Sequence, residues 1–285
     1  MTSAQHDRRP STAFRRRRVL AIAFAIIVVA GLIVAAVWWA SGGFEAREPA
    51  PSESPAASAQ PSASPSTSST PPAEPADKPK SFFDRDARSI DDPTSIWVVS
   101  NKLRPLNPID YAPQDLVNAA VPGSSTLRAE AAGAMEQMFA AATAEAGLSL
   151  AIQNAYRSYG TQVSLHNRLV EQLGVERARA QSARPGYSEH QTGLTADIMA
   201  ANGVCSIQEC FATTPEGMWL AENAWRFGYH LRYPQGKTDV TGYIFEPWHY
   251  RYVGTALAAE LHETQTLTLE EFFGLPPAPD YPPGV

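Results

Sequence analysis

The chain has 285 residues and a net charge of −6, and its composition changes sharply along its length. The first 80 residues consist of a basic segment, an apolar segment and a low-complexity segment, which leaves about two hundred residues for folding. We therefore expect one folded domain, although the length alone allows two. From Ser81 onward there are 14 Lys and Arg against 23 Asp and Glu, a net charge of −9, which argues against nucleic acid as a partner.

Residues 1–18 are polar and basic, and residues 19–40 are a run of apolar residues. A helix of that length spans roughly 30 Å, the thickness of a bilayer's hydrocarbon core, so the run predicts a single transmembrane anchor. Four arginines directly before it keep the N-terminus in the cytoplasm and place the domain outside the cell membrane. A cleaved signal peptide is the alternative, but its apolar core is shorter, about 7 to 15 residues.

Residues 41–80 form a linker rich in proline and serine, with almost no large apolar side chain after Phe44. Such a segment cannot bury enough apolar surface to fold, so we expect disorder with stiff polyproline II stretches. At about 3.1 Å per residue it is long enough to carry the domain into a cell wall. A glycosylated or protease-sensitive spacer is an equally compatible interpretation.

Hydrophobic periodicity and turn residues predict the elements of the domain, which we place at 81–275. Residues 101–113 are extended, and residues 276–285 form a frayed proline-rich tail. The order of helices and strands does not repeat, which indicates an α+β fold with helices packed on one small antiparallel sheet. Helices are expected at 125–146, 161–173, 175–183, 214–227, 253–263 and 267–273, and strands at 148–153, 193–199, 229–233 and 248–253.

Cys205 and Cys210 are the only cysteines, and both fall in the segment expected outside the cell. An oxidising environment permits a disulfide, which we predict here. Metal binding is the alternative, but a single pair lacks the further ligands of the usual cysteine motifs.

Two histidines and an aspartate, His190, Asp197 and His249, form a pattern typical of a metal site. Two imidazoles and one carboxylate suit one Zn²⁺ and leave a fourth position for water, as in catalytic zinc sites. Glu246 precedes His249 by three residues and is a spare carboxylate able to take a proton from that water. Because Pro247 follows it, we expect this pair on a strand or at the entry to one, rather than on the helix of the thermolysin-like motif.

Three motifs together resemble the VanY-type zinc D-alanyl-D-alanine carboxypeptidases, which trim the peptide stems of bacterial peptidoglycan. They are Tyr-Arg-Ser at 156–158, Ser-Glu-His-Gln-Thr-Gly-Leu-Thr-Ala-Asp at 188–197 and Glu-Pro-Trp-His at 246–249. The likeness runs from about Asn101 to Leu275, with Thr195 where the family more often has alanine. It implies the same α+β fold, with the zinc in a cleft at the face of the sheet.

The resemblance also implies the roles of individual side chains around the zinc. Arg157 matches an arginine that faces the metal and assists the reacting carbonyl, a task suited to a guanidinium that keeps its proton. Substrate contacts are implied for Ser188, Gln162 and Tyr233. We place Trp248 either in the core or in the wall of the cleft, where it would also meet substrate.

The expected function is a D,D-carboxypeptidase that releases the C-terminal D-alanine of stem peptides by attack of a metal-activated water. An L,D-carboxypeptidase acting on tetrapeptide stems shares these motifs and is the main alternative. A non-catalytic wall-binding module is expected to lack a metal or base residue, and none is missing. A serine acyl-enzyme needs Ser-x-x-Lys, which the sequence does not contain. The pattern carries no indication of oligomeric state.

Overall fold

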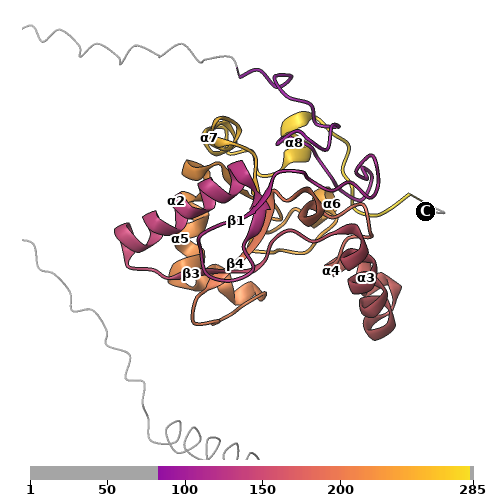
Figure 1. Ribbon diagram of the computed structural model, residues 1–285. Coiled ribbons are helices and arrows are strands. Elements are labelled where there is room, and N and C mark those ends of the chain that lie inside the picture. The colour runs from indigo at the N-terminus through magenta and orange to yellow at the C-terminus, as the bar shows by residue number, and fades with distance from the viewer. Residues whose placement is uncertain (1–82, 283–285) are drawn as a thin grey trace, which may run out of the picture. The chain divides into compact units, whose positions relative to one another are not determined.

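The structure, a computed structural model, describes residues 83–282, which form helices packed on two small antiparallel sheets (Figure 1). The strands are β1 (Leu116–Asn118), β2 (Thr126–Arg128), β3 (Leu150–Asn154), β4 (Thr195–Ala200), β5 (Tyr229–Leu231) and β6 (His249–Tyr252). The helices are α2 (Ala129–Ala146), α3 (Tyr159–Leu173), α4 (Val175–Gln181), α5 (Pro215–Asn223), α6 (Thr238–Thr241), α7 (Thr255–Glu263) and α8 (Leu269–Phe273). Three short 3-10 helices are η1 (Glu189–Thr192), η2 (Glu209–Thr213) and η3 (Ala224–Phe227).

The larger sheet has the strand order β3-β4-β6-β5, and every neighbouring pair is antiparallel. In the register of the two central strands Asp197 pairs with His249, and Ala196 pairs with Tyr250. Since successive side chains on a strand point to opposite faces, Asp197 and His249 share one face and Tyr250 lies on the other. This register brings together two residues that are 52 positions apart in the sequence.

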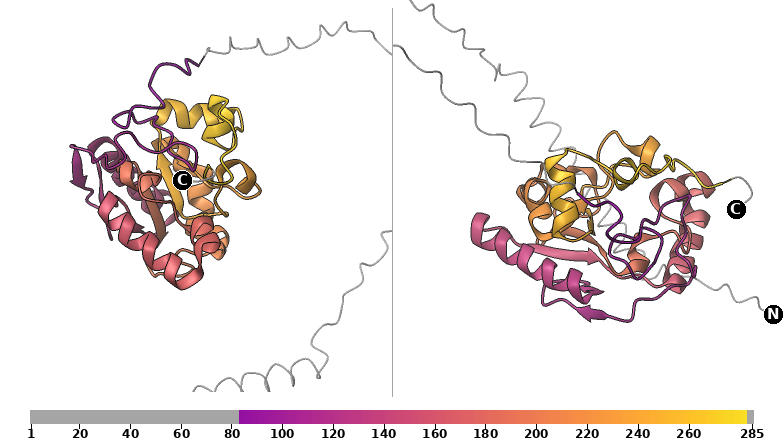
Figure 2. Two further views of the ribbon diagram at one scale, coloured as in Figure 1. Left: turned by 90° about the vertical axis from the view of Figure 1, so that its right-hand side faces the viewer. Right: turned by 90° about the horizontal axis from the view of Figure 1, so that it is seen from above.

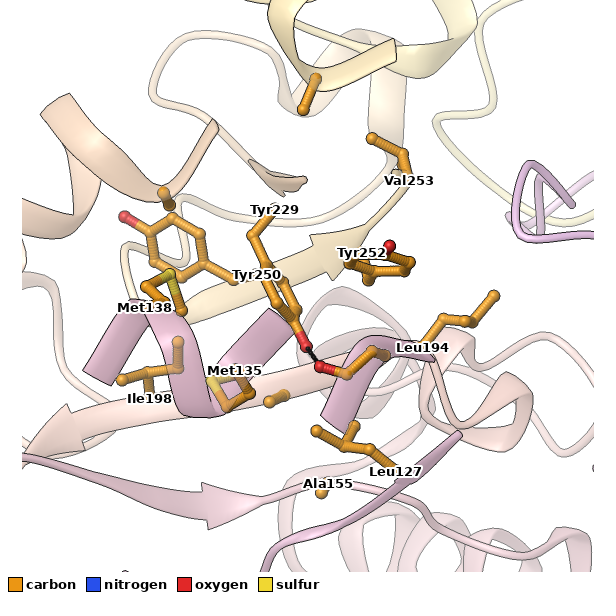
Figure 3. Packing of buried hydrophobic residues seen from close by; sticks show 14 of the residues in the cluster. Leu127, Met135, Met138, Ala155, Leu194, Ile198, Tyr229, Tyr250, Tyr252 and Val253 are labelled. Atoms are coloured by element: carbon orange, nitrogen blue, oxygen red, sulfur yellow. Dashed lines mark hydrogen bonds between the residues drawn. The ribbon is translucent and has the colours of Figure 1, made fainter. Parts of the chain in front are cut away.

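The Tyr250 face of the sheet packs on α2. Figure 3 shows Met135 and Met138 of this helix directed at Tyr229 and Tyr250 of the strands and at Ile198 of β4. All five side chains are almost completely buried. The helix is further fixed by the Tyr229 hydroxyl, which donates a hydrogen bond of 2.7 Å to the main-chain oxygen of residue 131. The central strands are therefore held against a rigid support on the side opposite Asp197 and His249.

The α3–α4 pair lies at the other end of the domain from α2, as Figure 1 and the right-hand view of Figure 2 both show. Helix α3 begins where the Ser158 side chain accepts a hydrogen bond from the main-chain nitrogen of Thr161. A Ser or Thr side chain in this position satisfies a free N–H of the first turn. Thr214 begins α5 in the same way, as the sequence predicts.

Several details differ from the prediction. The helix expected at 214–227 is an α-helix only to Asn223 and continues as the 3-10 helix η3. The helix expected from residue 125 begins at Ala129, because residues 126–128 pair with β1 in a second, two-stranded sheet. The sequence analysis anticipated neither of these three-residue strands. The tail after Leu275 is not frayed over its described part, since Ala278 and Tyr281 are buried and Ala278 N–H donates to Val240 O.

Within residues 83–282 no helix is both long enough and apolar enough to cross a bilayer. The predicted cytoplasmic tail, transmembrane anchor and linker at 1–18, 19–40 and 41–80 lie outside the described residues.

Candidate metal centre and cleft

The fold brings the three predicted metal ligands together. His190 comes from η1, Asp197 from β4 and His249 from the start of β6. His190 Nε2 lies 3.3 Å from Asp197 Oδ2, and His249 Nδ1 lies 3.2 Å from Asp197 Oδ1. One potential ligand atom from each residue lies within 4.8 Å of the others, and all three residues are buried. Two imidazoles and one carboxylate at this spacing fit a single metal ion that retains an open position.

Neighbouring groups orient two of these side chains. His190 Nδ1 lies 2.8 Å from the main-chain oxygen of Ala155, so this nitrogen carries the proton and Nε2 is free to bind a metal. Asn154, at the end of β3, donates from Nδ2 to Asp197 Oδ2 at 3.0 Å. The sequence analysis missed Asn154, because nothing in its local pattern distinguishes it from any polar residue at a strand end.

The charges around the site favour a cation. Burial opposes ionisation of Asp197, but the two histidines outweigh it and hold the pKa of this carboxyl well below its usual range. Burial lowers the pKa of His249, yet the nearby carboxylates of Asp197, Glu189 and Glu246 outweigh this and raise it to about 9. Without a metal ion the imidazole therefore takes up a proton. A divalent cation would supply the positive charge in place of that proton.

Glu246 stands beside the metal ligands without being part of the group. Its Oε2 lies 3.4 Å from His249 Nδ1, and its main-chain nitrogen donates to Tyr233 O. Burial is the main cause that raises the pKa of this carboxyl to about 8, assisted by the charge of Asp197 and opposed by His249 and Arg157. A buried carboxylate with a raised pKa is a stronger base than a carboxylate in water, as the predicted role requires.

A cleft of about 340 Å³ opens over this group. Arg157, Ser188, Tyr233 and Trp248 all line it, and Arg157 Nη2 lies 3.4 Å from Ser188 Oγ. The Tyr233 ring packs on the ring of His249 with 4.6 Å between centroids. Trp248 belongs to both predicted locations, because it lines the cleft and also lies in the hydrophobic core.

Gln162 differs from its predicted role as a substrate contact. It is fully buried in α3 and does not line the cleft. Its side-chain nitrogen donates to Ser182 Oγ at 3.1 Å and to Ala183 O at 2.6 Å, and both of those residues do line the cleft. Gln162 therefore supports the wall from behind.

The predicted disulfide between Cys205 and Cys210 is present, with an S–S distance of 2.05 Å. The loop that it closes carries Ile207, whose side chain lines the cleft. The sequence analysis attached no site role to this loop. It also gave no role to Glu189, whose side chain is fully buried next to His249.

Comparisons with known proteins agree with this geometry. The family model described as VanY, D-alanyl-D-alanine carboxypeptidase, matches residues 124–255. The Bacillus subtilis protein YodJ is 41% identical over 192 residues, which cover 65% of this chain and 69% of YodJ.

Two solved structures have similar folds. The LD-carboxypeptidase LdcB is 40% identical with a TM-score of 0.60, covering 64% of this chain and 87% of LdcB. A mutant of the vancomycin resistance D,D-pentapeptidase VanY in complex with Zn(II) is 30% identical with a TM-score of 0.52, covering 63% of this chain and 98% of that chain. With these relatives and the buried His-Asp-His group, the chain belongs to the VanY family of D-alanyl-D-alanine carboxypeptidases.

Proposed function

We propose that this chain is a zinc-dependent D,D-carboxypeptidase that removes the C-terminal D-alanine from peptidoglycan stem peptides. The observation that carries the proposal is the buried group of His190, Asp197 and His249 with Glu246 beside it, at the base of a cleft that also presents Arg157. The site contains every residue type that metal-assisted peptide hydrolysis needs, namely three ligands, a base and a fixed cation.

Each residue of the site has a separate role in the proposed hydrolysis. His190 Nε2, Asp197 and His249 Nδ1 would hold the zinc, which supplies Lewis acidity and lowers the pKa of water at its open position. Glu246 accepts the proton of the attacking water on its carboxylate and delivers it to the nitrogen of the leaving D-alanine. Arg157 Nε is buried and has no hydrogen-bond partner within the described residues. The guanidinium therefore has an unused donor for the oxygen that becomes negative in the transition state.

Substrate binding uses the polar part of the cleft. An exopeptidase must recognise a free terminal carboxylate, and Arg157 with Ser188 provides a charged donor and a hydroxyl at one place. A site built on such donors rejects substrates without the carboxylate, because the donors are then left unpaired.

An L,D-carboxypeptidase acting on tetrapeptide stems is the second candidate. One observation favours it, because the identity with the LD-carboxypeptidase LdcB is higher than that with the D,D-pentapeptidase VanY. The two activities differ in the configuration of the residue that precedes the scissile bond. The predicted ligands and base of this chain would serve either activity.

Mass spectrometry of defined stem peptides digested by the full-length protein, with and without chelator, separates the candidates. Loss of one alanine from the pentapeptide alone supports the D,D activity, and loss from the tetrapeptide alone supports the L,D activity. Cleavage at an undiminished rate of a stem whose terminal carboxylate is amidated would overturn the exopeptidase proposal.

The location at the cell surface is also a proposal. It rests on the apolar run at 19–40 with four preceding arginines and on the extracytoplasmic nature of the substrate.

A further inference from the structure

Two buried polar atoms face each other on the side of His249 that points away from Asp197. Glu189 Oε2 lies 3.7 Å from His249 Nε2. Across the described part of the chain, neither atom has a hydrogen-bond partner, and at this distance the two face each other without a hydrogen bond. A buried polar atom without a partner costs free energy, and here one atom is a carboxylate acceptor and the other a nitrogen that can carry a proton. The two atoms are therefore natural partners.

The pair decides which nitrogen of His249 can bind a metal. A neutral imidazole carries its proton on one nitrogen and a lone pair on the other. With the proton on Nε2, facing Glu189, the lone pair is on Nδ1, which lies 3.2 Å from Asp197 Oδ1. His190 has the opposite arrangement, because its Nδ1 faces the oxygen of Ala155 and its Nε2 faces Asp197. The two histidines thus present different nitrogens to one point.

Glu189 is itself held in place by two arginines. Its Oε1 accepts hydrogen bonds from Arg232 Nε at 2.9 Å and from Arg251 Nη1 at 3.1 Å, and all three side chains are completely buried. Arg232 is fixed from its other side, where Nη1 and Nη2 donate to Glu270 at 2.9 and 2.7 Å. Since both arginines bind Oε1, only Oε2 remains to face His249.

We propose that Glu189 is a positioning residue that keeps the proton of His249 on Nε2 and so presents Nδ1 to the metal. The inference rests on the proposed metal-dependent function and adds to it a group that lies outside the ligand set. Carboxylates that accept a proton from a ligating histidine fix its tautomer and raise its basicity as a ligand. A purely structural ion pair with the arginines would stabilise the fold without any effect on His249.

The substitution Glu189→Gln separates the two roles. Glutamine keeps the shape and leaves one oxygen for Arg232 and Arg251, but it places an NH₂ group opposite His249 Nε2. Two donors then face each other, which favours the tautomer with its proton on Nδ1. We expect the affinity of the full-length protein for zinc, measured by competition with a chromophoric chelator, to fall by about 10- to 100-fold.

Glu270→Gln is the matched control. Glu270 is equally buried and binds the same arginine, and the structure gives it no contact with His249. This variant should lower the midpoint of thermal unfolding but leave zinc affinity unchanged. Equal losses of zinc affinity in the two variants, or none in Glu189→Gln, would overturn the proposal.

Nitrogen NMR of the unmodified full-length protein loaded with ¹¹³Cd gives a test that does not depend on the folding of a variant. We expect cadmium coupling to Nδ1 of His249 and a proton on its Nε2, with the reverse at His190. Coupling to Nε2 of His249 would contradict the inference while leaving metal binding intact. A native protein that binds neither zinc nor cadmium would refute the proposed function itself, and this inference with it.

Discussion

Glu246 combines proximity to the metal ligands with a pKa near neutrality. Burial raises the pKa of its carboxyl to about 8, and its Oε2 lies 3.4 Å from His249 Nδ1. We expect Glu246→Gln to retain one zinc per chain and to lose activity by about 10²- to 10⁴-fold, because an amide cannot accept the proton of the attacking water. Metal analysis and stem-peptide cleavage on the same sample check both parts. Parallel loss of zinc and activity would make Glu246 a ligand and place the base elsewhere.

The other residues predicted to contact substrate differ in how they act. Arg157, Ser188 and Tyr233 line the cleft and can touch a substrate directly. Gln162 acts only through Ser182 and Ala183, which it holds by hydrogen bonds. A residue's position in a motif therefore does not say whether its side chain meets the substrate or supports one that does.

At the scale of elements, a disulfide closes one of the loops that line the cleft. Cys205 and Cys210 close a loop whose residue Ile207 lines the cleft. We expect replacement of both cysteines by serine to lower the free energy of unfolding by about 2 kcal/mol, the chain-entropy value for so short a loop. KM for the stem peptide should rise more than kcat falls, because Ile207 is no longer held at the cleft.

Denaturant unfolding and steady-state kinetics of this double variant measure the two effects separately. Ile207→Ala is the control, since it should change KM without the loss of stability. An unchanged KM in both variants would show that the loop contributes nothing to substrate binding.

Strand β5 contains a histidine that makes stability depend on pH. Burial lowers the pKa of His230 to about 4, and its Nε2 lies 3.1 Å from Leu267 O. In the unfolded chain the pKa is about 6.5, so below that pH the unfolded state binds a proton more readily than the folded state. The stability due to neutral His230 is complete above pH 6.5 and is lost as the pH falls toward 4.

Denaturant unfolding between pH 7 and pH 4 tests this prediction. The free energy of unfolding of His230→Gln should fall less steeply with decreasing pH than that of the native protein, since glutamine can keep a donor to Leu267 but does not titrate. Identical slopes for the two proteins would remove His230 as a source of acid sensitivity.

The sequence predicted those elements whose signals are local. The capping threonine at 214 and the alternation in 248–253 indicated α5 and β6 near their true positions. Strands β1 and β2 have only three residues each, too few for a period to show, so they were missed. Glu189 was missed because its partners Arg232, His249 and Arg251 lie 43 to 62 residues away. Such a network exists only once the sheet has formed.

At the scale of the whole molecule, the metal site depends on the assembled fold. Its ligands come from η1, β4 and β6, which adopt this arrangement only in the folded chain. An ion that binds only the folded state raises the free energy of unfolding, by about 2.7 kcal/mol when the free zinc concentration is 100 times the dissociation constant. Zinc should therefore raise the midpoint temperature of thermal unfolding of the native protein, and raise that of His249→Ala much less. An equal shift in both would place the stabilising metal elsewhere.

The central claim is that His190, Asp197 and His249 hold one zinc on which stem-peptide hydrolysis depends. Stepwise addition of zinc to the chelated full-length protein, with release of alanine followed at each step, tests it most directly. We predict that activity is absent before addition, rises in proportion to zinc and saturates at one ion per chain, and that His249→Ala neither holds stoichiometric zinc nor recovers activity. Full activity in the metal-free protein, or recovery by His249→Ala, would contradict the account.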